Sequence, residues 1–558
     1  IPIQLTAGVA DRFSVTEAEL LQSKMLRGKL FTLQINSFDG HGPVLPAMSS
    51  VMDFLSTPIA ISLTVILALL VIRSHTRRLG TENKKRYHPV GATVLSYLIN
   101  FSRLHDYMTE LAFKNKTYRV LNLFQDYVFT TDPANVEYFL KTNFANYGRG
   151  KYLYTILSDV LGDGIFAVDG EKWVHQRKVA SNELLTKSVR DFSGAVFKTN
   201  GVKLARIISE AATPGQAIEI QDLFMKAALD SIVKVLLGIE VDTMYGTNKE
   251  AIRFSNAFDV ANEMTLYRCV DFSWKIKKLL NIGSEALLRN SLNVADVFVY
   301  NLIKSKTETV ANSGDDLHLN RRDILSRLLE SGQTDPKYLR DIIFSLFVAG
   351  KDTAASTLTW FVYMVCKHPD IQDKIAQEVR EATNLKNNSS IDELADNLTE
   401  EALSKMQYLV AALTETSRLY PAVPLNAKVC SSDDTWPDEF SVKKGDIVGY
   451  HAYSMGRMKY IWGDDAEEFR PERWLNENGL VQQESSFKLI AFSAGPRICV
   501  GKEFAYREMM ILSAVLLGSY ILKLRDANKV ANYRTKFTHH IDGGLYVQAS
   551  PRFANASP

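Results

Sequence analysis

Apolar residues recur at helical spacing over most of the chain. The longest such stretch begins at Asp335 and Pro336, a helix cap followed by a proline at the first helical position, and ends at His368, before Pro369. At about 1.5 Å per residue, its roughly 30 residues cross about 45 Å. Because the stretch is apolar nearly all round, it predicts a buried central helix.

A second helix is predicted over residues 401–420, where apolar residues again follow a helical period. Glu415 and Arg418 share one face of this helix, at the i, i+3 spacing of an ordinary ion pair. Prolines at 421 and 424 require an extended segment after it.

Strand patterns are few and short. They lie at residues 118–123, 127–130, 446–450 and around 544–548. The polar stretches 304–322 and 384–401 are predicted to be surface loops. The pattern as a whole predicts a mainly α fold with small β-sheets.

An uninterrupted apolar segment lies near the N-terminus. Residues 54–72 are all apolar or small and uncharged, which predicts one transmembrane helix about 30 Å long. Basic residues crowd the linker at 73–89, whereas only Asp53 precedes the segment, so the body at 90–558 is predicted to face the cytosol. A cleaved signal peptide is the competing interpretation, but the basic residues follow the apolar segment and no A-x-A site ends it.

Residues 1–47 show no clear helical or strand period before Met48. They are predicted to be a non-native or upstream-translated extension and are left out of the fold prediction.

Composition excludes several classes of protein. The chain has 558 residues, with 65 Lys and Arg against 63 Asp and Glu, and a net charge of +2 gives no basic footprint for nucleic acid. No long Pro/Gly/Ser-rich linker divides the chain, so one large body is predicted and not three or four domains. Four irregularly spaced cysteines, without a C-x-x-C pair, predict no disulfides.

The candidate chemistry lies in residues 492–501, FSAGPRICVG, directly before a predicted helix. A phosphate-binding loop does not fit, because five residues separate Gly495 from Gly501 and Glu503 stands where Ser or Thr is needed. Alternatively, Cys499 is a thiolate metal ligand whose negative charge is stabilised by the backbone N–H groups and dipole of the helix. For a single cysteine, a buried structural thiol is the ordinary interpretation.

The residues around Cys499 favour haem as its partner. Gly495 and Gly501 let the backbone approach a flat cofactor, Phe492 can shield the sulfur, and Arg497 can pair with an acidic group of the cofactor. A proximal thiolate pushes electron density onto haem iron and favours O–O cleavage.

The segment matches F-x-x-G-x-R-x-C-x-G at every fixed position, and so resembles the haem-thiolate signature of the cytochrome P450 family. Four more motifs resemble that family in the same order along the chain. They are WVHQR at 173–177 (W-x-x-x-R), AGKDT at 349–353 (the oxygen-activation motif), ETSR at 415–418 (E-x-x-R), and FRPERW at 469–474, whose last arginine completes a Glu–Arg–Arg triad. The resemblance extends from about residue 50 to the end of the chain.

The resemblance implies a cytochrome P450 fold behind the transmembrane helix, and a haem b whose iron is bound by Cys499. The other cofactor contacts that it implies come from eight residues: Trp173, Arg177 and Arg497 at the haem propionates, with Phe492, Gly495, Gly501, Ala349 and Gly350 around the ring. It also implies O₂ as co-substrate, NADPH electrons delivered by a reductase, and a single-pass position in the endoplasmic reticulum membrane, in contact with lipid.

Asp352 and Thr353 are implied to be the catalytic residues, since Thr353 would hold iron-bound oxygen by hydrogen bonds and Asp352 would feed protons to it. Taken alone, these residues also fit a helix kink in which the threonine hydroxyl bonds back to a carbonyl. Glu415, Arg418 and Arg473 are interpreted as structural, because a buried charge stripped of its partner costs about 3–5 kcal/mol.

Two further segments, at 147–151 and 161–173, resemble the plant fatty-acid ω-hydroxylases of this family. A long apolar slot for such a substrate is predicted from six residues: Phe344, Phe347, Val348, Val423, Leu425 and Asn426. Arg149 and Tyr152 are candidates to bind the substrate carboxylate at its far end.

Three alternatives stay open on sequence alone: hydroxylation of a terpenoid, sterol or hormone; an isomerase or dehydratase of fatty hydroperoxides; and a haem-binding protein without turnover. Thr353 argues against the second, because such isomerases commonly lack it. His539 and His540 have no acidic or cysteine partner at metal spacing, and are interpreted as the flank of a turn.

Overall fold

The computed structural model describes residues 85–552, except 123–124, 212–215, 270, 272, 313–322 and 387–388. The predicted extension at 1–47, the anchor at 54–72 and most of the basic linker at 73–89 lie outside the described residues. Among the helices that are described, none is both long enough and apolar enough to cross a membrane.

Helices make up most of the described chain, as predicted. The earlier helices are α3 (Val94–Ile99), α4 (Leu104–Lys114), α5 (Pro133–Glu137), α6 (Gly150–Leu161), α7 (Gly170–Leu184), α8 (Lys187–Ala211), α9 (Ile220–Leu237), α10 (Lys249–Tyr267), α11 (Trp274–Leu280), α12 (Gly283–Asn312) and α13 (Ile324–Glu330). The later ones are α14 (Pro336–Gly350), α15 (Asp352–Lys367), α16 (Pro369–Thr383), α17 (Ile391–Asn397), α18 (Glu400–Lys405), α19 (Gln407–Leu419), α20 (Ala452–Met455), α21 (Lys459–Trp462) and α22 (Lys502–Ser519).

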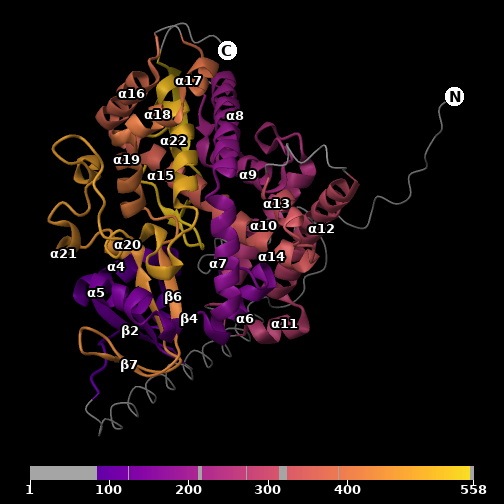
Figure 1. The fold of residues 1–558 in the computed structure, drawn as a ribbon. Coiled ribbons are helices and arrows are strands. Elements are labelled where there is room, and N and C mark those ends of the chain that lie inside the picture. The colour runs from indigo at the N-terminus through magenta and orange to yellow at the C-terminus, as the bar shows by residue number, and fades with distance from the viewer. Residues whose placement is uncertain are drawn as a thin grey trace, which may run out of the picture. The chain divides into compact units, whose positions relative to one another are not determined.

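The largest sheet joins strands from distant parts of the sequence. It has six strands in the order β1 (Val90–Thr93), β2 (Thr117–Leu121), β3 (Tyr127–Thr130), β9 (Ile447–His451), β6 (Leu425–Cys430) and β4 (Tyr147–Gly148). Strand β3 pairs in parallel with β9, which is why indigo and orange segments lie together in the lower part of Figure 1. Strand β6, whose first two residues belong to the predicted slot, pairs with β9 on one side and with β4 on the other.

The remaining sheets are smaller. One has three strands, β10 (Tyr520–Leu524), β13 (Tyr546–Pro551) and β5 (Ile218–Glu219). Two hairpins have two strands each, β11 (Tyr533–Arg534) with β12 (His540–Ile541), and β7 (Asp434–Thr435) with β8 (Ser441–Val442). The four predicted strands are thus found as β2, β3, β9 and β13, within a few residues of their predicted bounds.

The predicted central helix is confirmed, but it is interrupted. Asp335 caps α14 by accepting the Lys337 N–H at 3.1 Å, and Pro336 begins the helix. Lys351 separates α14 from α15, and Pro369 begins α16 after the end of α15. Both halves are largely buried, and they pack on α9, α19 and α22.

Some loop predictions are wrong. The stretch 384–401 contains α17 and the start of α18, because Ser390 and Thr399 each cap a helix by accepting an N–H three residues later. The first part of the stretch 304–322 belongs to α12, which continues to Asn312. The helix predicted over 401–420 is divided at Met406 into α18 and α19. In the stretch 384–401, local caps and not polarity decided the structure.

Helix α22 follows the Cys499 segment into the core. In Figure 1 the yellow α22 lies between α8 and α16, and it packs against both. Glu508 on this helix is only 2% exposed, and one of its carboxylate oxygens has no hydrogen-bond partner. Burial therefore raises the pKa of Glu508 to about 8.

We expect Gly449→Ala to destabilise the six-stranded sheet. A Cβ at this position would lie 2.5 Å from the Asn426 carbonyl oxygen and 3.0 Å from the Phe129 ring, so β6 would have to move. Overpacking of this kind costs about 1–3 kcal/mol, measured as the free energy of unfolding in urea. Gly194→Ala in α8 is the control, because its Cβ would meet only Arg507 at 3.9 Å, and it should raise stability by about 0.5–1 kcal/mol. Equal effects of the two substitutions would contradict the tight β6–β9 packing.

Glu508 predicts a pH dependence of stability. Between pH 4.5, its ordinary pKa, and about 8, the unfolded chain has released this proton while the folded protein keeps it, so stability falls as pH rises. We expect Glu508→Gln to be more stable than the wild type by roughly 1–4 kcal/mol at pH 8, and similar to it near pH 4. Unfolding of both proteins across this range measures the difference, with the exposed Glu503→Gln in the same helix as the control. A difference that does not vary with pH would contradict a buried neutral carboxyl.

Candidate active site

Cys499 lies in a tight loop that leads directly into α22. Short 3₁₀ turns at Ile490–Phe492 and Gly495–Arg497 fold the segment, and the Cys499 N–H donates to the Phe492 carbonyl at 2.9 Å. The Cys499 side chain is exposed. The loop thus presents the sulfur outward from the first turn of a helix.

Glycine at positions 495 and 501 of the loop is explained by two different features of the structure. Gly495 has a φ of +66°, and a Cβ there would lie 2.2 Å from the Leu140 carbonyl oxygen. For Gly495, the backbone and its close neighbour explain the glycine better than a cofactor does. A Cβ on Gly501 would meet no protein atom nearer than the Cys499 sulfur at 4.0 Å, so protein packing does not require glycine there. Approach of a flat group fits Gly501.

The surroundings of the thiol act on it in opposite directions. Although Cys499 is exposed, the dense protein around its thiol raises the pKa by desolvation, while the Gly501 N–H and the charges of Arg177 and Lys502 lower it. An N–H donor and two cations are groups that favour a thiolate. The ring of Phe492 stacks on Tyr506, with 5.4 Å between centroids, and packs at the edge of the core.

Helix α7 brings the W-x-x-x-R motif to the same loop. Arg177 donates to the Ile498 carbonyl, next to Cys499. The guanidinium of Arg497 lies over the Trp173 ring, 4.5 Å from its centroid. The structure therefore places Trp173, Arg177, Arg497 and Cys499 together, although they come from opposite ends of the sequence.

Two basic residues at this site, Arg149 and Lys428, were not among the haem contacts predicted from the sequence. Arg149 donates to the Ala427 carbonyl at 2.9 Å, and the charges of Arg149 and Arg497 both lower the pKa of the buried Lys428. Asp169 is the acidic partner of the group, at 2.5 Å from Arg497. Three cations thus face one carboxylate, and we call Arg149, Lys428, Arg497 and Asp169 the cation cluster.

Burial shifts the pKa of two members of the cation cluster. Burial, followed by the Arg149 charge, lowers the pKa of Arg497 to about 10, and burial lowers the pKa of Lys428 well below its ordinary value. The Nε atoms of Arg149 and Arg497 are buried without a hydrogen-bond partner. Uncompensated buried cations of this kind fit a ligand that carries carboxylates, as haem does.

The prediction that Arg149 binds a substrate carboxylate at the far end of a slot is corrected, because Arg149 belongs to the cation cluster. Tyr152 lies beside Tyr127 instead, with which it shares a hydrogen bond. The place of Lys428 at this site could not be predicted from the sequence, because Lys428 lies in the short strand β6, outside every motif.

The oxygen-activation motif lies where α14 passes into α15. The Thr353 hydroxyl donates to the Ala349 carbonyl at 2.5 Å, which is the back-bonded kink of the structural interpretation. Gly350 was predicted to contact the cofactor, but a Cβ there would lie 2.6 Å from Ile232 of α9, so close helix packing accounts for this glycine. Asp352 is partly buried, and its Oδ1 has no hydrogen-bond partner.

Glu415 joins α19 to the segment 470–474 inside the core. Its carboxylate accepts two hydrogen bonds from Arg418 at 2.7 Å, one from the Trp474 indole at 2.9 Å, and one from the Arg470 N–H at 3.0 Å. Arg473 approaches the same carboxylate at 3.4 Å. Glu415 and Arg418 have side chains that are 0% exposed, so the predicted ion pair is fully buried.

The predicted substrate pocket is partly wrong. Phe344 and Phe347 are 0% and 1% exposed and pack with Phe254 and Phe258 of α10 in the helical core. They are core residues, because helix α10 covers that face of α14. The other candidates, Val348, Val423, Leu425 and Asn426, are partly exposed.

His539 was interpreted as the flank of a turn, but it is fully buried. It is 0% exposed, and its carbonyl accepts hydrogen bonds from Ser356 and Trp360 of α15, both at 2.6 Å. His540 lies in strand β12. His539 thus fastens the β11–β12 hairpin to the central helix.

Comparisons with known proteins give one family. A sequence profile described as Cytochrome P450 matches residues 88–546. Cytochrome P450 704C1 of Pinus taeda is 44% identical over 518 residues, which cover 90% of this chain and 99% of that protein. Cytochrome P450 704B1 of Arabidopsis thaliana is 40% identical, covering 88% and 100%, and cytochrome P450 94B1 of the same plant is 34% identical, covering 90% and 98%.

We expect Glu415→Ala to abolish haem incorporation and not merely slow turnover. The substitution leaves Arg418 buried without its partner, at a cost of about 3–5 kcal/mol. Haem per polypeptide, measured on purified protein, tests this. Glu472→Ala, in the same segment but with a half-exposed side chain paired with Lys374, is the matched control and should cost no more than about 1 kcal/mol. Normal haem content in the Glu415 variant would refute the role.

Proposed function

The chain belongs to the cytochrome P450 family, and from this membership we propose that it hydroxylates long-chain fatty acids at the ω position. It is a cytochrome P450 monooxygenase, an enzyme that places one oxygen atom of O₂ into a C–H bond. The observation that carries this assignment is the convergence of Cys499, Arg177 and the cation cluster at the start of α22.

Haem bound through the Cys499 thiolate supplies the activation of O₂ and the transfer of one oxygen atom. Arg497, Arg149 and Lys428 would hold the two carboxylates of haem and neutralise them, with Trp173 stacked on Arg497. The planar guanidinium of arginine suits this task, because it meets a carboxylate with two parallel hydrogen bonds. Arg177 fixes the loop by its bond to the Ile498 carbonyl.

Proton transfer is assigned to Asp352 and Thr353. The Asp352 Oδ1, which has no hydrogen-bond partner, can take up a proton and release it, and the Thr353 hydroxyl can donate to a reacting group once it leaves the Ala349 carbonyl. Both groups follow directly on Lys351, at the interruption of the central helix.

The substrate class is supported by the segments 147–151 and 161–173, which resemble plant fatty-acid ω-hydroxylases. Partly exposed apolar residues after α19 and on α14 support it too: Val348, Val423 and Leu425 suit an alkyl chain. The Asn426 side chain accepts a hydrogen bond from Arg149 at 3.3 Å and so links this region to the cation cluster.

We further propose that electrons come from NADPH through a reductase in the same membrane, and that residues 54–72 anchor the enzyme in the endoplasmic reticulum with its body in the cytosol. The apolar segment and the basic residues after it support this orientation.

The function is tested with a panel of substrates. We expect acids of palmitate to oleate length to bind with a high-spin spectral shift and to yield ω-hydroxy acids with NADPH and a reductase, identified by mass spectrometry. Cys499→Ser, the control, should lose the carbon-monoxide spectrum of a thiolate-bound haem. Preference for terpenoids or sterols would contradict the substrate class, and turnover of fatty hydroperoxides without NADPH would contradict the monooxygenase reaction.

A further inference from the structure

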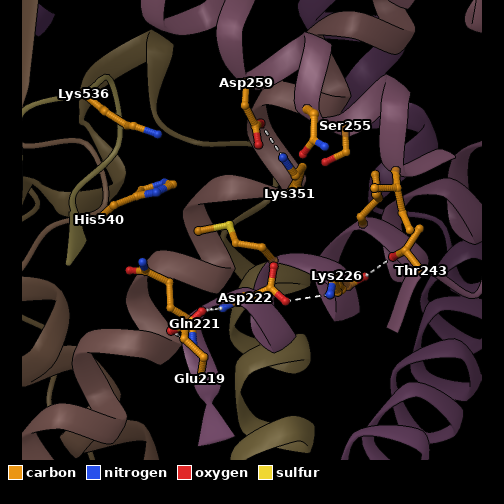
Figure 2. Close-up of a pocket in the computed structure, with 14 residues that line it drawn as sticks. Glu219, Gln221, Asp222, Lys226, Thr243, Ser255, Asp259, Lys351, Lys536 and His540 are labelled. Carbon is orange, nitrogen blue, oxygen red and sulfur yellow. Dashed lines mark hydrogen bonds and ion pairs between the residues drawn. The ribbon is translucent and has the colours of Figure 1, made fainter. Parts of the chain in front are cut away.

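A polar cavity of about 220 Å³ lies behind the motif at 349–353, between α9, α10, the β11–β12 hairpin and the central helix. Figure 2 shows Lys536 and His540 reaching toward it from the hairpin, and Asp259 with Lys351 at another side. None of the predicted cofactor or pocket residues lines it. A polar cavity of this size has room for several water molecules.

Lys351 is the residue that connects this cavity with the catalytic pair. Its side chain is 3% exposed and forms an ion pair with Asp259 of α10, whose side chain is 38% exposed. On the other side, the Lys351 ammonium lies 3.5 Å from Asp352 Oδ1, within ion-pair range but without a hydrogen bond. One ammonium is therefore shared unequally by two carboxylates.

Lys351 stays charged in this position. Burial lowers the pKa of Lys351, but the carboxylates of Asp259 and Asp352 raise it by more, so that the pKa lies above its ordinary value. Because the cation is permanent, whichever carboxylate it approaches more closely is held ionised.

We propose that Lys351 is a positioning residue that sets how readily Asp352 takes up a proton, and that Asp259 tunes it by competing for the Lys351 ammonium. The proposal rests on the proposed monooxygenase function but not on the identity of the substrate. In the structure Asp259 holds the ammonium more closely than Asp352 does.

Two further titratable groups of the hairpin face the cavity, Lys536 and His540. Burial lowers the pKa of Lys536, which lies within electrostatic range of Asp259 and Asp352. On α10 and the hairpin, Glu263 pairs with Arg534 at 2.8 Å and lies 3.9 Å from Lys536. Burial lowers the pKa of His540 to about 3, so it is neutral.

On α9, Asp222 pairs with Lys226 at 2.6 Å, and Glu219 accepts N–H bonds at the helix start. Asp259 is thus the acidic residue of the cavity lining that contacts Lys351. Because Asp259 lies on α10, a shift of that helix would change how the Lys351 ammonium is shared between Asp259 and Asp352.

The proposal predicts opposite effects of two neutral substitutions. Lys351→Met removes the cation beside Asp352 and should make its carboxylate easier to protonate, whereas Asp259→Asn leaves the ammonium to Asp352 and should make that carboxylate harder to protonate. The measurement is product formed per NADPH oxidised, as a function of pH. We expect the midpoint to move up by about one pH unit for Lys351→Met and down by a similar amount for Asp259→Asn, since one charge at this distance acts on that scale.

Two variants provide controls. Lys351→Arg keeps the charge and should leave the midpoint within about 0.3 pH unit of the wild type. Asp222→Asn, on the α9 side of the cavity where Asp222 pairs with Lys226, should do the same. KM for the substrate should stay constant in all four single variants, because the proposal concerns the proton. Midpoints that stay fixed, or that move in the same direction for Lys351→Met and Asp259→Asn, would overturn it.

A second measurement does not depend on turnover. In thermal unfolding of the haem-loaded protein, the effects of Lys351→Met and Asp259→Asn should be non-additive in the double variant, as expected for an ion pair. Additive effects would overturn the pairing itself. The pH midpoint can be measured with any apolar substrate that is hydroxylated, so a failure of fatty acids alone would reject the substrate class and not this inference.

Discussion

The buried carboxylate of Glu415 is the interaction on which the active-site architecture depends. It binds Arg418 on its own helix, and it binds the backbone N–H of Arg470 and the indole of Trp474 in the segment that leads toward the Cys499 loop. Arg418 in turn donates to the Glu468 carbonyl at 3.0 Å. Because these buried charges are satisfied by groups at residues 468–474, that segment cannot shift against α19 without leaving a buried ion unpaired. The same helix packs on the turn Ile490–Phe492, which begins the Cys499 loop.

The same cost of burying charge explains the two unusual groups near the reaction centre. The cation cluster holds three basic side chains against Asp169 alone, an imbalance that suits an acidic ligand. At Lys351 the imbalance is reversed, since two carboxylates share one ammonium. The first group lacks negative charge and the second has it in excess, so the two suit different chemistry.

Local signals predicted the elements that depend on neighbours in sequence. The cap at Asp335, the proline at 336 and the continuous apolar pattern gave the central helix, and the short alternating runs gave β2, β3 and β9. Predictions failed where distant packing decides. Phe344 and Phe347 were assigned to a slot, but α10 covers them, and Gly350 is required by Ile232 of α9.

By itself, the sequence determined the family and the sulfur ligand, because the motif around Cys499 has a fixed spacing that only local backbone geometry requires. Only the tertiary structure added Lys428 and Arg149 to the predicted Arg497. These two residues lie far apart in the chain and outside the haem motifs, yet the pairing of β4 with β6 brings their charges together. Electrostatic interaction depends on distance in space and not along the chain, so a pattern of residues cannot reveal it.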